Sequence, residues 1–316
     1  MDSIKNKKDM PADMETPKTL PINYNTQVLV QTEAITDIDE GAVKVQGNNY
    51  WIGHLKCYNW EMPTHFHDHY EICFFLTENI TCNVGTKSYV LKSGSIAVFN
   101  DTDIHRIIVS PDVLHDRFII QFNPKFMQEM FFAYPELTEQ FTNRTSRFQN
   151  CLQLDETQKE KIILLLNKFI YCYEDKNTNS YKLKIKLILC EILLFINEIY
   201  YANQISPAVK NYAYNEQLRP IMEYIQDNLS MDLNLDNLVS KFFIGKQTLI
   251  KLFKREIGLT PNQYLIYCRI IKAREFIKQG IYIYKVCELV GYTNISSFIR
   301  TFRRLTGYTP KYYQKK

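Results

Sequence analysis

Three histidines and one glutamate stand at a spacing that could bind a divalent metal ion. His65 and His67 are separated by one residue, Glu71 follows four residues later, and His105 comes after a polar turn. On a β-strand, residues i and i+2 project to one face, so the first two imidazoles are expected to share a face. Three imidazoles and a carboxylate are a plausible donor set for a divalent cation. A metal-free pocket for a small molecule and a purely structural role are the alternatives.

Short runs typical of β-strands surround these residues. We expect them at 50–58, 70–76, 80–84, 88–91, 95–99, 105–109 and 117–122, separated by polar or Gly-bearing turns. Such spacing favours an all-β sandwich or barrel. The predicted domain covers residues 23–150 and follows a flexible arm, residues 1–22, which mixes charge with Pro and lacks periodicity.

The pattern from His65 to Glu71, completed by His105, resembles the cupin motif, in which these side chains surround a metal inside a barrel. Gly94 also matches that motif. Asn100 and Thr102 replace the Pro and Gly that cupins have, so the second turn departs from the pattern. The resemblance implies a cupin-like barrel.

Near the other end of the chain, a segment occurs twice. Residues 252–264 recur as 301–313, with Phe, Arg, Gly, Thr, Pro and Tyr in register. Each copy ends a pair of short amphipathic helices joined by a tight turn, at 235–258 and 283–307, which predicts two helix-turn-helix units. Residues 261–278 are expected to form the helix that connects them.

The second helix of each predicted unit leaves basic and polar residues off its apolar stripe. Such side chains pair with phosphates and read base edges. Gly245 and Asn294 stand where these helices begin, and the backbone N–H groups of a helix N-terminus also bind phosphate. The outward positions are Lys246, Gln247, Ile250, Lys251, Lys254 and Arg255 in the first unit, and Ile295, Ser296, Ile299, Arg300, Arg303 and Arg304 in the second.

Residues 216–316 resemble the DNA-binding domain of AraC/XylS-type transcription regulators. The match includes Leu238-Val239, Phe253-Lys254, Gly258, Pro261, Arg269, Gly291-Tyr292, Phe302-Arg303, Gly307 and Thr309-Pro310. Gly245 replaces a common Ser, and Phe243 takes a turn position often held by Gly. The resemblance implies binding to double-stranded DNA in two successive major grooves about 34 Å apart. The DNA-binding residues that it implies are Lys246, Gln247, Ile250, Lys251, Lys254, Ile295, Ser296, Arg300 and Arg303.

The resemblance also bears on the histidine cluster. Sensor domains of AraC-type regulators often contain a segment similar to residues 65–72 without metal-dependent catalysis. We therefore expect no catalytic residue, no cofactor and no bound metal, and a protein that is not an enzyme. A small-molecule effector would be held by His65, His67, Tyr70, Glu71 and His105.

Charge is distributed unevenly along the chain. Residues 216–316 contain 17 Lys and Arg against 8 Asp and Glu, a net charge of +9, so the first 215 residues carry −5 of the total +4. This asymmetry favours a nucleic-acid contact in the basic part.

Residues 151–215 predict two long helices and a linker, and the cysteines and apolar runs indicate the cellular compartment. Residues 159–173 and 181–201 read as long helices, the second apolar on nearly every side, so a helical segment at 151–203 is expected to form a homodimer through residues 155–202. Residues 204–215 are the expected linker. The eight cysteines form no C-x-x-C pair, no secretory leader precedes them and no apolar run is long enough to span a bilayer. We expect a cytoplasmic protein without membrane contact.

Together these features predict a sequence-specific DNA-binding transcription regulator that responds to a small-molecule effector. By resemblance it is an activator, and RNA polymerase is a candidate partner. The alternative is a cupin-type metal-binding enzyme or metal sensor with an accessory DNA-binding domain.

Overall fold

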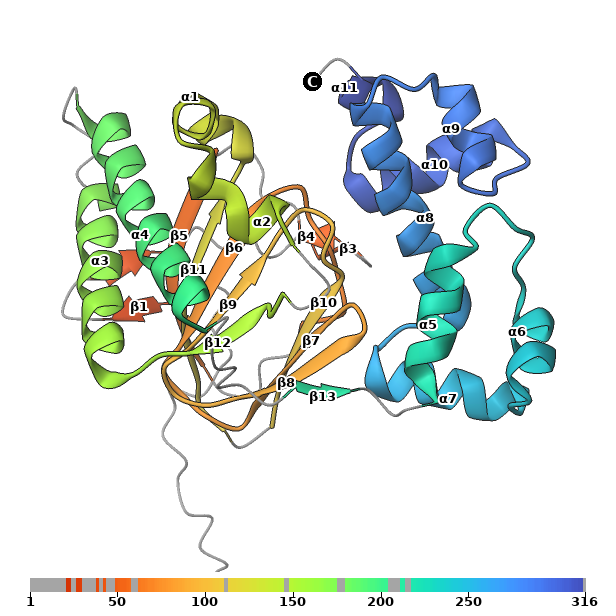
Figure 1. The fold of residues 1–316 in the computed structure, drawn as a ribbon, viewed down its shortest axis with the longest axis horizontal. Coiled ribbons are helices and arrows are strands. Elements are labelled where there is room, and N and C mark those ends of the chain that lie inside the picture. Colours follow the sequence, from red (N-terminus) through yellow and green to blue (C-terminus); the bar gives the residue numbers. More distant parts are fainter. Residues whose placement is uncertain are drawn as a thin grey trace, which may run out of the picture.

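The computed structural model shows a β-rich N-terminal domain beside an all-helical C-terminal domain (Figure 1). It describes residues 21–23, 27–29, 38–39, 42–43, 49–57, 62–110, 113–144, 148–174, 180–203, 211–213 and 217–314. Residues 1–20 of the predicted arm lie outside this range. The expected fold class, a cupin-like β-domain with a helical segment and then an all-α domain with two helix-turn-helix units, is confirmed.

Two antiparallel sheets form the N-terminal domain. Their strand orders are β12-β9-β6-β11-β5 and β10-β7-β8-β13. All residues of β6, β9 and β11 are buried, because both faces of the larger sheet are covered. The strands of the two sheets are β5 (Tyr50–Cys57), β6 (Tyr70–Phe75), β7 (Ile80–Val84), β8 (Lys87–Leu91), β9 (Ser95–Phe99), β10 (His105–Val109), β11 (His115–Phe122), β12 (Cys151–Gln153) and β13 (Asn211–Ala213). The seven predicted strands are therefore confirmed.

Smaller elements complete this domain. Two short antiparallel pairs precede the sheets, and four short helices follow β11. They are β1 (Pro21–Asn23), β2 (Gln27–Leu29), β3 (Ile38–Asp39), β4 (Ala42–Val43), η2 (Pro124–Met127), α1 (Gln128–Ala133), η3 (Pro135–Thr138) and α2 (Glu139–Thr142).

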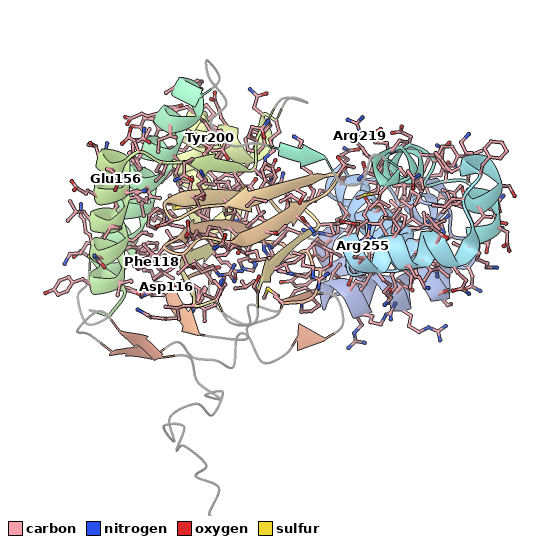
Figure 2. All side chains as sticks on the ribbon, turned by 90° about the horizontal axis from the view of Figure 1, so that it is seen from below. Asp116, Phe118, Glu156, Tyr200, Arg219 and Arg255 are labelled. Atoms are coloured by element: carbon pink, nitrogen blue, oxygen red, sulfur yellow. The ribbon has the colours of Figure 1, made fainter. Side chains whose placement is uncertain are left out.

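Two long helices, α3 (Glu156–Glu174) and α4 (Tyr181–Asn203), pack side by side against the larger sheet (Figure 1). Their buried apolar residues belong to the same core as the strands, and side chains fill the space between (Figure 2). This confirms the two predicted helices. Across the described part of the chain, we find no helix that combines the length and apolarity needed to cross a bilayer.

The expected linker at 204–215 contains a strand that the sequence did not predict. Asn211–Ala213 forms β13, whose backbone pairs with β8 in the smaller sheet. Backbone hydrogen bonding to an edge strand requires little of the side chains, so the composition of this short segment gave no signal of it. Part of the segment that connects the two domains, residues 211–213, is thus paired with the N-terminal sheet.

Seven helices make up the C-terminal domain and share one hydrophobic core. They are α5 (Leu218–Asp227), α6 (Leu235–Phe242), α7 (Lys246–Glu256), α8 (Pro261–Lys278), α9 (Ile283–Leu289), α10 (Ile295–Thr306) and α11 (Pro310–Gln314). The pairs α6–α7 and α9–α10 are the two predicted helix-turn-helix units. The connecting helix α8 has the predicted bounds and begins with a capping box between Thr260 and Gln263.

Phe243 ends α6 in a strained conformation. Its φ is 49°, in the left-handed region, and its side chain is 97% exposed. A β-carbon makes this region unfavourable by about 1 to 2 kcal/mol, and the exposed ring gains no packing in return. Glycine therefore suits this turn better than phenylalanine.

We expect Phe243→Gly to raise the free energy of unfolding by about 1 kcal/mol, because relief of the left-handed strain exceeds the added flexibility of the unfolded chain. Urea unfolding followed by circular dichroism measures this. Phe243→Ala is the matched control, since it removes the same ring and retains the β-carbon. Equal stability of the two variants would show that φ is not the cause.

Candidate functional site

The second helices of the two units, α7 and α10, have the division of faces that the sequence predicted for the recognition helices of a DNA-binding domain. On α7, Leu249, Leu252 and Phe253 are buried, and on α10 Phe298, Phe302 and Leu305 are buried. All nine predicted DNA-binding residues lie off these stripes. Lys246, Gln247, Lys251, Lys254, Ile295, Ser296, Arg300 and Arg303 are exposed, and Ile250 is half-buried.

A surface depression lies along α10 and the turn that follows it. A depression of about 660 Å³ is lined by Ser296, Ile299, Arg300, Arg303, Arg304, Gly307 and Thr309. Three guanidinium groups along one depression suit a phosphate backbone. On α7, by contrast, Lys246 is paired with Asp236 at 2.9 Å, and both side chains are exposed, so this ion pair is a weak one.

The N-termini of the two helices differ. The Asn294 side chain accepts a hydrogen bond of 2.9 Å from the backbone N–H of Ser297 and caps α10. Gly245 begins α7 and has no side chain to do so. Both predicted starting positions are confirmed, and only the second has a side-chain cap.

The turn of the second unit lies close to the segment that follows α5. Arg269 on α8 donates hydrogen bonds to the carbonyl oxygens of Leu229 at 3.0 Å and Met231 at 2.7 Å. Gly291 has φ of 76°, and a β-carbon there would lie 2.4 Å from the oxygen of Leu229. Gly291 is therefore required both by its backbone conformation and by this close approach.

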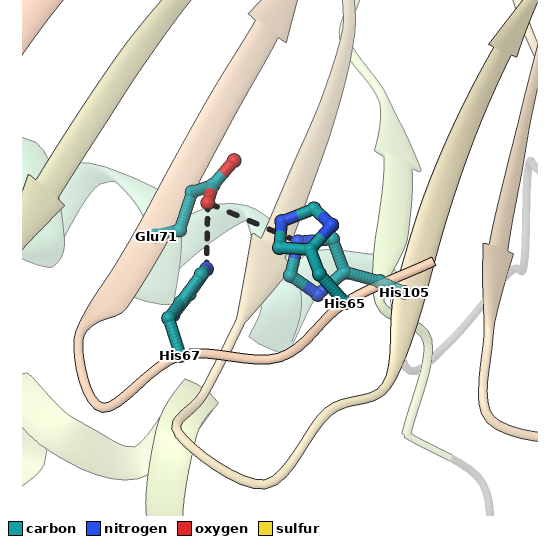
Figure 3. Close-up of side chains that lie close together, drawn as sticks. All are labelled: His65, His67, Glu71 and His105. Carbon is teal, nitrogen blue, oxygen red and sulfur yellow. Dashed lines mark hydrogen bonds and ion pairs between the residues drawn. The ribbon is translucent and has the colours of Figure 1, made fainter. Parts of the chain in front are cut away.

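The histidine cluster lies inside the N-terminal domain. His65, His67, Glu71 and His105 are all buried, and their candidate ligand atoms lie within 4.8 Å of one another (Figure 3). His67 Nε2 is 2.8 Å from Glu71 Oε2, and His105 Nε2 is 3.9 Å from it. The four residues that the sequence singled out are thus brought together.

Their positions in the chain differ in one respect from the prediction. His65 and His67 were expected on a strand, but they lie in an extended loop before β6, where His65 makes only an isolated bridge with His105. The extended backbone still alternates, so both imidazoles reach the cluster. Glu71 comes from β6 and His105 from β10 of the facing sheet.

Tyr70, the fifth predicted effector residue, does not join the cluster. It precedes Glu71 on β6 and so points to the opposite face. There its ring stacks on Phe141 at 4.1 Å and meets Phe122 edge-on at 5.7 Å. Tyr70 belongs to the core between the sheet and the short helices.

The outer nitrogens of the three imidazoles are all engaged by the backbone. The Nδ1 atoms of His65, His67 and His105 lie 3.0, 2.9 and 3.1 Å from the carbonyl oxygens of Pro63, His69 and Asp103 respectively. A carbonyl only accepts, so each Nδ1 must carry a proton. The Nε2 atoms of His65 and His105 are then left with their lone pairs, whereas Nε2 of His67 donates to the Glu71 carboxylate. Carbonyl groups orient metal-binding histidines in this way.

The electrostatic setting also suits a cation. Burial opposes ionisation of Glu71, but the hydrogen bond and charge of His67, with His105 and Arg117, hold its pKa well below the usual value. Burial lowers the pKa of His65 well below its usual value and that of His105 to about 4. The pKa of His67 is raised, because Glu71 outweighs the effect of burial. A carboxylate beside two neutral imidazoles is the state in which these groups bind metal.

A metal ion fits this donor set. His105 Nε2 has no hydrogen-bond partner among the described residues. Burying such a nitrogen without a partner costs free energy, unless a ligand binds it. Three nitrogens and one carboxylate oxygen match the ligands of zinc and neighbouring divalent metals.

Two residues that contact Glu71 were not predicted from the sequence. Cys73 donates from its thiol to Oε1 at 3.0 Å, and Gln121 Nε2 donates to Oε2 at 2.7 Å. Cys73 could have been found from its position two residues along the same strand. Gln121 faces Glu71 through the β6–β11 register, for which the local sequence gives no signal.

Comparisons with known proteins find a matching family model for each of the two domains. A family model described as AraC-like ligand binding domain matches residues 50–193, and a helix-turn-helix domain model matches residues 238–316. The chain is 34% identical over 95 residues to the probable transcriptional regulator LumQ of Photobacterium leiognathi, covering 30% of this chain and 38% of that protein. It is 20% identical over 264 residues to the transcriptional activator RhaS of Escherichia coli, covering 79% and 87%.

Among solved structures, ToxT from Vibrio cholerae aligns with 85% of this chain and 98% of its own length, at 12% identity and a TM-score of 0.35.

We expect Gly291→Ala to lower the free energy of unfolding by about 3 kcal/mol, because it adds both left-handed strain and a clash with Leu229. Gly280→Ala is the matched control: its φ is 82°, but nothing lies within 4 Å of the added atom. It should cost about 1 kcal/mol. Equal losses, measured by chemical denaturation, would contradict the role given to the close approach.

Proposed function

This chain belongs to the AraC family of transcription regulators, and we propose that it reads DNA by placing α7 and α10 in two successive major grooves. The observation that carries the proposal is the repeated division of faces on these helices: three apolar residues buried on each, with basic and polar residues exposed. The continuous helix α8 supports a fixed separation of the two units, as contact with neighbouring grooves requires.

We assign roles by position along each helix. Residues near the helix N-terminus enter a major groove most deeply, so Lys246, Gln247, Ile250 and Lys251 read bases in one groove, and Ile295, Ser296 and Arg300 in the next. Lys254 and Arg303 lie a turn later and pair with phosphates. The net charge of +9 on residues 216–316 supports attraction to DNA along the whole domain.

We expect Arg300→Ala and Lys251→Ala each to weaken specific binding by about 1 to 3 kcal/mol, or about 5- to 150-fold, because each removes a base contact. Fluorescence anisotropy at several salt concentrations measures the affinity and its slope, which should be near −0.9 per phosphate neutralised. Arg219→Ala, an exposed substitution on α5, is the matched control.

An operator selected from a random DNA library by the unmodified chain provides the specific site. If both variants bind that site and random DNA as the unmodified chain does, neither residue reads a base.

We further propose that the N-terminal domain binds its effector at His65, His67, Glu71 and His105. The separation of at most 4.8 Å among their ligand atoms leaves room for an ion and not for an organic molecule. A divalent transition-metal ion is therefore the effector that the geometry supports, in place of the small organic effector expected from sequence. The regulators found among the relatives give no support to the alternative of a cupin-type enzyme.

The outward faces of α3 and α4 support a homodimer. Large apolar side chains are exposed there, with a seven-residue spacing between Leu164 and Tyr171 and between Leu187 and Leu194. Two copies packed through a twofold axis would cover such a stripe, since residues seven apart lie on one face of a helix. We therefore place the dimer contact in residues 155–202, as the sequence suggested.

We expect the unmodified chain to sediment as a dimer at micromolar concentration and Leu187→Glu to sediment as a monomer, because the change buries a charge in the contact. Val90→Glu is the control, because Val90 is exposed on β8 of the smaller sheet, whereas α3 and α4 pack against the larger sheet. A monomeric unmodified chain would refute the dimer.

The likeness to RhaS, named as an activator, supports activation of transcription, with RNA polymerase as the partner. We place this activity in the cytoplasm, where a regulator meets DNA.

A further inference from the structure

The loop that carries two of the cluster histidines also contacts the C-terminal domain. Phe66 lies between His65 and His67, and the alternation of an extended backbone directs its ring away from the cluster. The ring is 1% exposed and belongs to the hydrophobic core of the C-terminal domain. It meets Tyr267 of α8 edge-on at 5.4 Å, and the guanidinium of Arg274 lies 5.7 Å from its centre.

Polar contacts hold the same loop to α8. Arg274, with a side chain only 3% exposed, donates from Nη1 to the carbonyl oxygens of Asp101 at 2.8 Å and His67 at 3.3 Å. Its Nη2 and the ammonium group of Lys278 both pair with the Asp101 carboxylate. Burial disfavours the charge on Asp101, but these two cations outweigh it and lower its pKa.

A second set of contacts reaches the first recognition helix. The hydroxyl of Thr64 donates to the carbonyl oxygen of Ile257, and Asn83 Nδ2 donates to that of Glu256 at 2.8 Å. The last carbonyls of a helix have no partner within the helix, so the N-terminal domain satisfies the end of α7. One short loop therefore touches the cluster, α7 and α8.

We propose that residues 64–67 couple occupancy of the cluster to docking of the C-terminal domain, so that a bound divalent metal ion strengthens the docked arrangement. This inference rests on the metal-ion effector proposed above. The ligand atoms, already within 4.8 Å of one another, need only a small contraction to reach metal-ligand distances. Coordination by His65 and His67 fixes the backbone on both sides of Phe66, and so holds its ring in the C-terminal core.

Thermodynamic reciprocity provides a test that uses the full chain. If metal strengthens docking, then docking must raise the affinity for metal by the same factor. Variants that weaken the docked contact from the C-terminal side must therefore weaken metal binding. Arg274→Met with Lys278→Ala removes the polar contacts to the loop and to Asp101 and changes no cluster side chain. Lys272→Met is the matched control on α8, because the ion pair of Lys272 with Glu275 and its cation–π contact with Phe276 both lie within that helix.

Zinc affinity, measured by competition with a chromophoric chelator, should be at least about fivefold weaker in the double variant than in the unmodified chain and in Lys272→Met. Asp101→Asn, which weakens the same contact from the N-terminal side, should shift the affinity in the same direction and serves if the double variant does not fold. Hydrogen exchange should show zinc protecting residues 62–69 and the end of α7 in the unmodified chain, and not in His105→Ala.

Two results would overturn the proposal in different ways. Zinc bound equally or more tightly by the docking variants would leave the metal site intact and refute the coupling. An unmodified chain that binds no zinc would refute both the metal-ion effector and its coupling, whereas DNA binding by Arg300→Ala and Lys251→Ala tests the regulator separately.

Discussion

A carboxylate buried between two sheets is the constraint on which the N-terminal domain depends. Glu71 is 3% exposed, and a buried charge without partners would cost several kcal/mol. Its partners come from a loop, from β6 itself and from β11, through His67, Cys73 and Gln121. These segments meet only if β6 is central in its sheet and paired in register with β11. The same packing fixes the loop before β6, whose outer side receives the C-terminal domain.

The two helix-turn-helix units are similar in sequence but are stabilised differently. The second unit holds its recognition helix at the N-terminus, through the Asn294 cap. The first has Gly245 at that position and a strained Phe243 before it, and its recognition helix is instead held at the C-terminal end by Thr64 and Asn83. The first unit thus depends on the neighbouring domain for support that the second provides for itself.

Much of this fold could be predicted because its signals are local. The bounds of α8 follow from a Thr-Pro start and an apolar period, and both recognition helices follow from their stripes. The four cluster residues were also found, from the spacing of the first three and the resemblance of the whole set to the cupin motif. The features that escaped prediction depend on contacts between distant segments: the β13–β8 pairing, the position of Gln121, and the burial of Phe66 against Tyr267. Tyr70 is a different case, because its place beside Glu71 in the predicted strand 70–76 already puts the two side chains on opposite faces.

The single helix between the two units limits how the DNA sequence recognised by this chain can change. In the proposed arrangement, one residue inserted into α8 would advance the second unit by about 1.5 Å and rotate it by about 100°. The exposed face of α10 would then no longer meet the major groove next to the one that α7 enters. Base preference can therefore drift through single substitutions on the exposed faces of α7 and α10. The distance between the two halves of the DNA site cannot change in this gradual way. Lengthening or shortening α8 by one residue at a time would leave one of the two helices facing away from its groove.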